Sequence, residues 1–387
     1  MKLRSFGPRL LICLATLLLS SLSFAQTENT ATIDCSGATP GAFTSITQAI
    51  ISSPDHSVFT VTGNCTDNID IQRRNDLSFF ATSPVTIQAG APDRSLLIIS
   101  NSQDIDFSGP ITMNGGTGVL VANSNNVKFF SVTMQNSSTF GISTLNSQVQ
   151  VFNGSVSTNT RSGVVTFGGT MELDGVTISN NGRIGVSSAT THLIMTDGND
   201  LPTIVSNNGI AGVQISNSSQ GDFTDLQITN NAGNNFGLQA FTNTGVVMQG
   251  GSITGNTGIG VNCVATTHCE FFQTQISGNS GGGIQISTHS ELALDGGVQI
   301  SSNTGAGVLI DQASAFGSSG GNVISNNSGD ALIVNALSAL DFVAPDTITA
   351  TAGNLALNCN NGSMVTGDIS TYKPKKCGVA FQAVPIH

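Results

Sequence analysis

The chain has 387 residues and a formal net charge of −11, and only 9% of its residues are charged although 39% are hydrophobic. Ser, Thr, Asn and Gly replace the missing charges. Because these residues favour turns over helices, and because the chain holds only four Glu and five Lys, the composition excludes a largely helical protein. The acidic balance also excludes a nucleic-acid partner, which needs a basic surface.

Residues 1–25 have the three parts of a secretory signal peptide. Three basic side chains lie within the first nine residues, residues 10–19 form an apolar run, and a small-x-small cleavage site ends at Ala25. The run is shorter than the roughly 20 residues that span a bilayer, and no later segment is longer. We therefore predict an extracellular protein whose mature chain has no transmembrane anchor. Cleavage removes three positive and no negative charges, so the net charge changes from −11 to −14.

Residues 26–59 are predicted to form an N-terminal cap. Ser45–Gln48 fits a capping box, in which the serine and glutamine side chains satisfy free N–H groups at the start of a helix. The apolar side chains in this segment share one face of a short helix: Phe43, Ile46, Ala49 and Ile50. The segment is therefore expected to hold a short amphipathic helix.

A repeat of about 24 residues organises the next part of the chain. Its anchor is a small residue followed by an aliphatic one, and it recurs at steps of 22 to 27 residues at Gly118, Gly141, Gly163, Gly185, Gly212, Gly237, Gly260, Gly283, Gly307 and Ala331. Seven residues earlier, nine of ten positions are apolar: Ile111, Met134, Val156, Ile178, Val205, Ile253, Ile276, Ile300 and Ile324. Four residues earlier, eight of ten are Asn: Asn114, Asn159, Asn181, Asn208, Asn256, Asn279, Asn303 and Asn327. This agreement indicates a solenoid.

Each copy is long enough for three short strands and three turns. A further inward position is expected nine to twelve residues after the anchor, at Phe130, Phe152, Leu173, Phe223, Phe271, Leu294, Phe316 and Phe342. The Asn of each copy suits a tight turn because Asn adopts positive φ more readily than most residues. Stacked Asn amides are expected to hydrogen-bond from coil to coil. Because one coil cannot bury its inner face alone, we expect ten to twelve coils to stack.

The pattern Ile-x-x-Asn-x-x-x-Gly-Val resembles the repeats of the pectin-lyase-like superfamily. The resemblance covers residues 60–342. It implies an all-β fold, a right-handed parallel β-helix whose N-terminal end is plugged by the helix expected in 26–59. Residues 343–387, with the basic run Lys373–Lys376, are expected to form a C-terminal cap. Caps keep the end coils from pairing with other molecules, and we expect a monomer.

Six cysteines remain after cleavage of the signal peptide. An even count in an exported protein predicts disulfides, although six cysteines allow 15 connectivities. Proximity along the chain favours the pairs Cys35–Cys65, Cys263–Cys269 and Cys359–Cys377. No CxxC or paired Cys/His spacing is present, so we predict no metal site at these cysteines.

Enzymes of the resembled superfamily act on acidic polysaccharides, but their motifs are missing here. The polygalacturonase segments Asn-Thr-Asp, Asp-Asp, Gly-His-Gly and Arg-Ile-Lys do not occur, and the nearest matches are Asn256-Thr257-Gly258 and Arg183-Ile184-Gly185. The Arg-x-Pro-x-x-Arg element of calcium-dependent pectate lyases and the Asp-Pro-His-Glu signature of alginate epimerases are also absent. These absences count against the known activities and leave a new one open.

Six acidic residues fall on three consecutive coils: Glu172, Asp174, Asp197, Asp200, Asp222 and Asp225. Stacking is expected to bring them into one sector of the rod, and alternation around Leu173 and Phe223 points three of them outward. Such a cluster suits a general acid/base pair or calcium, and apart from calcium we predict no cofactor. The alternative is a set of solvated acids on the turns of an acidic protein.

Other polar residues give weaker signals. Arg161 and Arg183 both lie two residues before an anchor, so they are expected to stack on adjacent coils and to offer a site for a uronate, or to be solvated turn residues. The five histidines share no column of the repeat and are interpreted as surface residues. With no Trp and one Tyr, the chain has few aromatic platforms for sugars.

Two functional hypotheses remain. The first is a non-catalytic extracellular protein that binds a polysaccharide, a cell-surface glycan or another surface. The missing motifs and the regular coils favour it. The second is a polysaccharide lyase or glycoside hydrolase acting on acidic polysaccharide through the six acids. The longest repeat steps, 27 and 25 residues, lie beside those acids and favour the second hypothesis, because loops on a rigid scaffold often carry function.

Overall fold

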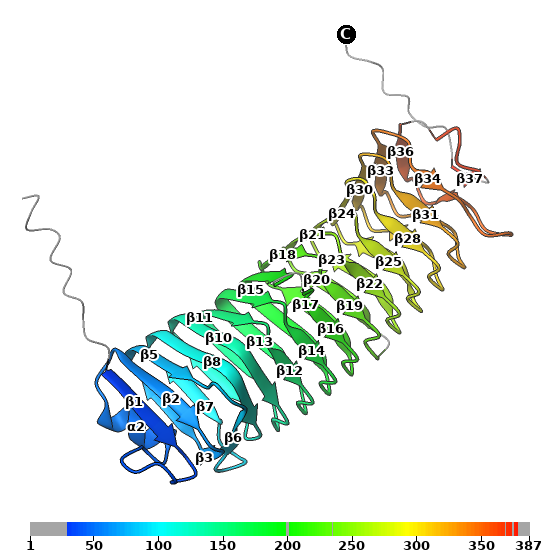
Figure 1. The fold of residues 1–387 in the computed structure, drawn as a ribbon. Helices are drawn as coiled ribbons and strands as arrows, with labels where there is room; N and C mark the ends of the chain where they lie inside the picture. The colour runs from blue at the N-terminus through cyan, green and yellow to red at the C-terminus, as the bar shows by residue number, and fades with distance from the viewer. Residues whose placement is uncertain (1–28, 199–200, 234, 368, 374, 378–387) are drawn as a thin grey trace, which may run out of the picture.

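The structure confirms the predicted right-handed parallel β-helix (Figure 1). It is a computed structural model that describes residues 29–198, 201–233, 235–367, 369–373 and 375–377, so the predicted signal peptide at 1–25 lies outside the described residues. The described chain forms 37 strands, all paired in parallel, and one α-helix. They wind into a straight rod of about 13 turns, slightly more than the ten to twelve expected.

Each coil has three faces, numbered in chain order from the anchor. Face 1 starts at the anchor and contains β4 (Ile69–Gln72), β7 (Leu97–Ser100), β9 (Val119–Ala122), β17 (Ala211–Ser216), β20 (Phe236–Phe241), β23 (Ile259–Val264), β26 (Gly282–Ser287), β29 (Val308–Ile310), β32 (Leu332–Val334), β35 (Leu357–Cys359) and β37 (Lys375–Lys376). Three longer strands bend from face 1 into face 2: β11 (Ile142–Phe152), β13 (Val164–Asp174) and β15 (Ile184–Thr196).

Face 2 follows face 1, and face 3 precedes the next anchor. Face 2 contains β1 (Asn29–Asp34), β2 (Ser57–Thr62), β5 (Asn75–Phe80), β18 (Gln220–Thr224), β21 (Gly245–Gln249), β24 (His268–Phe272), β27 (Glu291–Leu294), β30 (Ala315–Ser318), β33 (Ala339–Phe342) and β36 (Met364–Thr366). Two strands, β8 (Gln103–Asn114) and β10 (Asn125–Gln135), bend from face 2 into face 3. Face 3 otherwise contains β3 (Cys65–Asp67), β6 (Val85–Ala89), β12 (Ser155–Ser157), β14 (Thr177–Ser179), β16 (Ile204–Ser206), β19 (Gln227–Thr229), β22 (Ser252–Thr254), β25 (Gln275–Ser277), β28 (Gln299–Ser301), β31 (Val323–Ser325) and β34 (Thr347–Ile348).

A ladder of buried asparagines runs along the turn between face 3 and face 1. Its members are Asn159, Asn181, Asn208, Asn231, Asn256, Asn279, Asn303 and Asn327. At each step the carboxamide oxygen of one Asn accepts the backbone N–H and the side-chain Nδ2 of the Asn one coil earlier, the latter at 2.9–3.0 Å. Each Nδ2 also donates to a backbone carbonyl one coil earlier, so the buried amides are satisfied between coils.

The ladder differs from the sequence expectation in two ways. The positive φ falls on the residue before each ladder Asn, as at Asn180 and Asn207, because the ladder side chain must point inward while its neighbour turns the chain. Asn114 is not a member, since the turn after it is two residues shorter than in the later coils and its amide bonds Gln88 on the outer surface. Asn231 is the ladder member of its coil but lies six residues before its anchor, so a search four residues before the anchor missed it.

The anchor must be small because the ladder and the core close over it. A methyl group at Gly237 would lie 2.7 Å from Ile253 Cγ2 and 2.8 Å from both Asn256 Nδ2 and the Gly260 carbonyl oxygen. Carbon atoms cannot approach so closely without displacing the neighbouring coil. From Gly141 to Gly307 the anchor glycines therefore reflect the close approach of the next coil, whereas Gly118 also has a positive φ of 92°.

A second ladder, of hydroxyl groups, runs along the bend between face 1 and face 2. Buried serines there accept a backbone N–H from the previous coil at 3.1–3.2 Å: Ser102, Ser124, Ser147, Ser219, Ser290, Ser314 and Ser338. Inside the rod, four phenylalanines stack in the N-terminal coils, with ring centroids 4.6–5.7 Å apart: Phe59, Phe79, Phe107 and Phe129. Two polar ladders and one apolar stack thus fix how each coil sits on the next.

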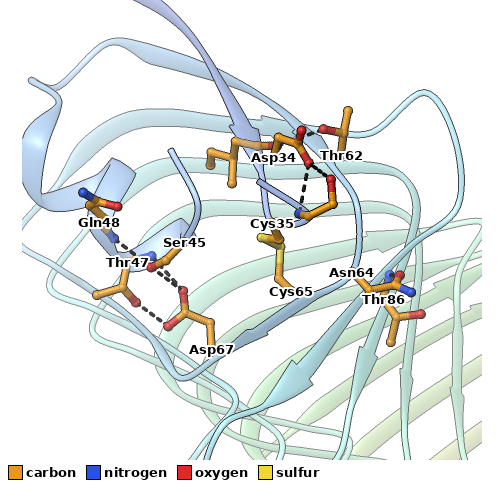
Figure 2. Close-up of a disulfide and its surroundings, with 12 residues drawn as sticks. Asp34, Cys35, Ser45, Thr47, Gln48, Thr62, Asn64, Cys65, Asp67 and Thr86 are labelled. Atoms are coloured by element: carbon orange, nitrogen blue, oxygen red, sulfur yellow. Dashed lines mark hydrogen bonds between the residues drawn. A yellow bond between two sulfur atoms is a disulfide. The ribbon is translucent and has the colours of Figure 1, made fainter. Parts of the chain in front are cut away.

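The predicted N-terminal helix is present as α2 (Ile46–Ser52), with Ile46, Ala49 and Ile50 buried. Figure 2 shows the residues that hold its start: the Ser45 hydroxyl accepts the N–H of Gln48, and the Asp67 carboxylate accepts the N–H and hydroxyl of Thr47. At the other end Arg74 donates to the Ile50 carbonyl, where a cation also complements the helix dipole.

The three predicted disulfides are confirmed: Cys35–Cys65, Cys263–Cys269 and Cys359–Cys377, with Cα–Cα separations of 5.0, 6.6 and 4.8 Å. The first ties the turn after β1 to β3 (Figure 2), and the second crosses the bend between faces 1 and 2 inside the rod. In the described residues face 3 ends with β34, face 2 with β36 and face 1 with β37. No helix in the described ranges is long and apolar enough to cross a membrane.

We predict that Asn256→Ala destabilises the rod strongly. The change leaves the Asn231 amide, the Ile228 carbonyl and Asn279 without their partners, and each buried polar group left unsatisfied costs about 1–3 kcal/mol. The expected loss in the free energy of unfolding is about 3 kcal/mol or more, measured by urea denaturation. Asn235→Ala, at an exposed position, is the control and is expected to stay within about 0.5 kcal/mol of wild type. Equal stability of the two variants would contradict the role of the ladder.

A second prediction concerns pH. Hydrogen bonds from Ser36 and Thr39 lower the pKa of Asp34 to about 2. A depressed carboxyl pKa stabilises the fold fully above the free-residue value of 3.8, and the contribution is lost as the pH falls through about 2. Asp34→Asn is therefore expected to lower the urea midpoint at about pH 6, by a difference that shrinks between about pH 4 and pH 2. Asp93→Asn, at an exposed position, should show no such trend. A difference independent of pH would refute the assignment.

Candidate functional site

An open groove follows the outside of the bend between face 1 and face 2. Two adjoining hollows of about 450 and 590 Å³ form it, and both include Asn123 and Asn125. We call it the bend groove, and its lining residues are Arg73, Arg74, Asn75, Asn101, Ser102, Gln103, Asn123, Ser124, Asn125, Asn146, Ser147, Gln148, Gly169 and Thr170. Apart from Gly169 and two arginines, the lining consists of amide and hydroxyl side chains. The Arg74 guanidinium lies 2.6 Å from the Asp55 carboxylate.

The groove exists because the chain turns sharply at the same place in successive coils. Asn101, Asn123 and Asn146 have φ values of 46–49°, and the hydroxyl ladder fills the inside of the bend beneath them. Short amide side chains that tolerate this backbone therefore recur on the outside. The groove is a direct product of the turn chemistry, repeated at the coil spacing of about 4.8 Å.

Outward side chains of face 2 form three columns beside the groove. Column A contains Gln148, Thr170, His192, Gln220, Gly245, His268 and Glu291. Column B contains Asp106, Lys128, Gln150, Glu172, Ile194, Asp222, Val247 and Glu270. Column C contains Phe80, Ser108, Phe130, Phe152, Asp174 and Thr196. Column A shares Gln148 and Thr170 with the bend groove, so groove and face are continuous.

Two aromatic rings lie on the outside of column C, against expectation. Phe130 and Phe152 stack with ring centroids 4.8 Å apart, and 36% of Phe130 is exposed. The sequence predicted both as inward residues. Strand pairing aligns Val151, not Phe152, with the buried Leu173, so each phenylalanine stands one residue away from the inward position and points outward. The doublets Phe129-Phe130 and Val151-Phe152 were the sequence signal for one apolar side chain on each side of the strand.

The six predicted acids are distributed over face 2 and the turns at its end. Glu172, Asp174 and Asp222 lie on the outside of face 2, where Gln150 donates to Glu172 at 2.5 Å and Thr196 donates to Asp174 at 2.7 Å. Asp197 and Asp225 are exposed on the turns that follow β15 and β18. Asp200 lies outside the described residues. Glu172 and Asp222 share column B but are two coils apart, with Ile194 between them.

Histidines contribute to this face, which the sequence did not predict. His192 Nε2 lies 2.6 Å from Asp222 Oδ2, and His268 Nδ1 lies 3.3 Å from Glu291 Oε2. Both histidines are exposed, as expected, but they share column A, which corrects the interpretation that no two histidines share a column. His192 lies seven residues after its anchor and His268 lies eight, because the bend in β15 has one residue fewer than the bends of the later coils. Counting from the anchor therefore puts the two histidines in different columns.

Lys128 sits in column B beside the half-buried Asp106. Burial raises the pKa of Asp106, an effect that the positive charge of Lys128 opposes and that Asp104 and Asp76 reinforce. One carboxylate oxygen of Asp106 is buried without a hydrogen-bond partner. Among the described residues, Lys128 is the one lysine or arginine within the strands of face 2.

The two predicted arginines lie elsewhere. Arg161 and Arg183 are exposed on the turn between face 3 and face 1, and the N–H of Arg183 donates to the Arg161 carbonyl, so they occupy adjacent coils as expected. This turn is separated from the acids of face 2 by another face of the rod. In the described part of the chain, no group of three or more His, Cys, Asp or Glu side chains is placed to hold a metal ion.

No protein-family model matches the chain, and no curated protein sequence matches it. Among solved structures it is similar to the A-module of the mannuronan C-5 epimerase AlgE4 of Azotobacter vinelandii, at 12% identity over 87% of this chain and 92% of that chain, with a TM-score of 0.52. It is also similar to pectate lyase Pel9A (11% identity, 91% and 79%, TM-score 0.41) and to tailspike protein 3 of bacteriophage CBA120 (9%, 96% and 72%, 0.45). At such identities the likeness shows the parallel β-helix fold alone.

The electrostatics of face 2 give a testable prediction. Lys128→Met removes the positive charge that lowers the pKa of Asp106, so that pKa is expected to rise further. Carboxyl-carbon NMR titration measures the change. Arg183→Met, on the far turn, should leave the Asp106 titration unchanged. A titration of Asp106 that is the same in Lys128→Met and wild type would contradict the arrangement.

Proposed function

We propose that this chain is a non-catalytic extracellular protein that binds a polysaccharide along the bend groove and face 2. The observation that carries the proposal is the continuous open groove, lined by amides and hydroxyls on consecutive coils and continuous with face 2, which carries the Phe130–Phe152 pair in column C. Amide and hydroxyl side chains both donate and accept hydrogen bonds, which suits the hydroxyl groups of a sugar chain. The partly exposed rings of Phe130 and Phe152 add apolar surface to face 2.

The repetition of the groove supports a polymeric ligand. Equivalent side chains recur every coil, about 4.8 Å apart, so a long glycan can make the same contacts repeatedly. The two ladders hold the coils rigidly, which lowers the entropy lost when the ligand binds. One structural neighbour, with a TM-score of 0.52, is an epimerase of mannuronan, and its fold agrees with a glycan-interacting role.

The proposed location is extracellular. Three disulfides suit an oxidising compartment, and the segment 1–25 has the pattern of a signal peptide. The proposed form is a monomer, because α2 packs at the N-terminal end against β1, β3 and β4. The net charge disfavours nucleic acid as a partner.

A second candidate function is a polysaccharide lyase or glycoside hydrolase acting on acidic polysaccharide. The observation that favours it is the His192–Asp222 pair at 2.6 Å on the same face as Glu172 and Asp174, because catalysis of either kind needs a positioned acid and base. Against it, Asp222 also accepts a hydrogen bond from Gln220, and Glu172 and Asp174 are each engaged by a neighbour. We propose no cofactor, and calcium binding by the acids is a separate alternative that the experiment tests.

The first experiment tests the mature chain for binding to and turnover of a panel of acidic, neutral and amino polysaccharides. Binding is measured by affinity electrophoresis, and turnover by reducing ends and unsaturated-uronate absorbance, with calcium and with chelator. We predict binding without turnover. Asn125→Ala combined with Gln148→Ala should weaken binding about fivefold or more, because two hydrogen-bonding side chains leave the groove. The control is Asn235→Ala, away from the groove.

Each outcome decides between the candidates. Turnover that disappears when Asp174, Asp197 and Asp222 become Ala would establish the enzyme and refute the non-catalytic role. Binding that the groove variant leaves unchanged would move the site away from the bend. Absence of both binding and turnover over the whole panel would overturn both candidates.

A further inference from the structure

The bend groove has an apolar border on its face 1 side. Leu145 and Phe167 are aligned on the neighbouring strands β11 and β13, and they are 40% and 50% exposed. Each lies two residues before a residue of the groove lining, Ser147 or Gly169. Among the described residues, Phe167 is the most exposed phenylalanine. The groove therefore places amide and hydroxyl side chains next to an apolar surface.

The ring of Phe167 is accessible from the groove. The two residues between it and Thr170 are Gly168 and Gly169, so no side chain of its own coil stands between the ring and the lining. On the next coil Phe167 is aligned with Ala189, whose methyl group is too small to cover a ring. None of the aromatic ring pairs among the described residues includes Phe167. A half-exposed ring without an aromatic neighbour offers flat apolar surface to a ligand.

The groove is bounded on its C-terminal side. The bend from β17 to β18 has one residue more than the bend within β15, as the pairing of these strands shows. Ser219 still accepts the N–H of Thr191 in the hydroxyl ladder, so the added residue lies outside the ladder and raises the outer surface. The lining ends at Thr170, before this step. The groove therefore fits a short stretch of a sugar chain.

The larger of the two hollows, of about 590 Å³, has an uncharged lining. Its residues lie between Asn123 and Thr170, and none of them is acidic or basic. Face 1 beside it is uncharged as well, since up to the bend its described strands from β7 to β35 contain no Asp, Glu, Lys or Arg. The two arginines of the groove line the smaller hollow. A charged group that leaves water in the larger hollow meets no opposite charge in the lining, which makes its binding costly.

We propose that the larger hollow of the bend groove binds a chain of neutral sugars, with one sugar ring against Phe167. The inference rests on the proposed glycan-binding function and names its ligand class. The apolar face of the sugar ring covers the exposed phenylalanine, and the sugar hydroxyls bond the amides and hydroxyls of the lining, which both donate and accept. Uronates and amino sugars are disfavoured because their charges lose water without gaining a partner.

The test compares four hexamers on the mature chain by titration calorimetry: those of β-1,4-linked glucose, N-acetylglucosamine, glucosamine and galacturonate. The first two are neutral, the third is cationic and the fourth is anionic. At about pH 6 we expect at least one neutral hexamer to bind at least about tenfold more tightly than either charged one. A neutral ligand forms no ion pairs, so its affinity should change less than about twofold between low and high salt.

Three variants assign the binding to the apolar border. Phe167→Ala removes the ring and should weaken binding of the neutral hexamer about fivefold or more. Phe167→Tyr keeps the ring and should leave the affinity within about twofold of wild type. Phe80→Ala is the matched control, because Phe80 is 42% exposed in column C of face 2, away from the bend. It should also stay within about twofold. Thermal unfolding checks that each variant is folded.

The failure of this inference and the failure of the proposed function look different. A charged hexamer that binds as tightly as both neutral ones, or more tightly, would overturn the ligand class while glycan binding stands. Neutral binding that Phe167→Ala leaves unchanged, or that Phe80→Ala weakens equally, would overturn the placement of the sugar ring. If no glycan of the polysaccharide panel and none of the four hexamers binds, the proposed function falls together with this inference.

Discussion

The constraint on which the structure depends is that every buried amide and hydroxyl at a turn must find its partner in the neighbouring coil. Asn256 shows this most directly, since its carboxamide bonds both the preceding and the following coil. An unsatisfied group at such a site costs more than the bond itself contributes, so the ladder admits one register. The register then determines the position of every strand, and with it the columns of side chains on the outer faces.

The candidate site follows from that regularity. Face 2 presents outward residues at a constant spacing, so a charge or a ring that occurs on several coils becomes an extended surface. The bend groove arises in the same way, because the turn over the hydroxyl ladder repeats at Asn101, Asn123 and Asn146. A ligand with repeating units matches such a surface better than a compact one does. The polysaccharide that we propose as the ligand has such repeating units.

Much of the fold was predictable because the repeat consists of regular spacings between residues that are close along the chain. The anchor column, the buried column before it, the helix at Ile46–Ser52 and the three disulfide pairs all follow from short distances along the chain. The errors arose where the length of a turn within the coil varies by one or two residues. Counting from the anchor placed Phe152 inside, missed Asn231, included Asn114 in the ladder and separated His192 from His268. A shift of one residue reverses the direction of a strand side chain, so counting cannot decide its face.

By itself the sequence determined the parallel β-helix, the identity of the ladder residues in most coils and the acidic character of the protein. Those properties depend on residue type and on spacing within one repeat. Only the tertiary structure decided which side chains share a column, because that depends on strand register between coils. The stacked Phe130–Phe152 pair, the His192–Asp222 contact and the groove beside them join residues 22 to 30 positions apart, and they exist only once the coils are in register.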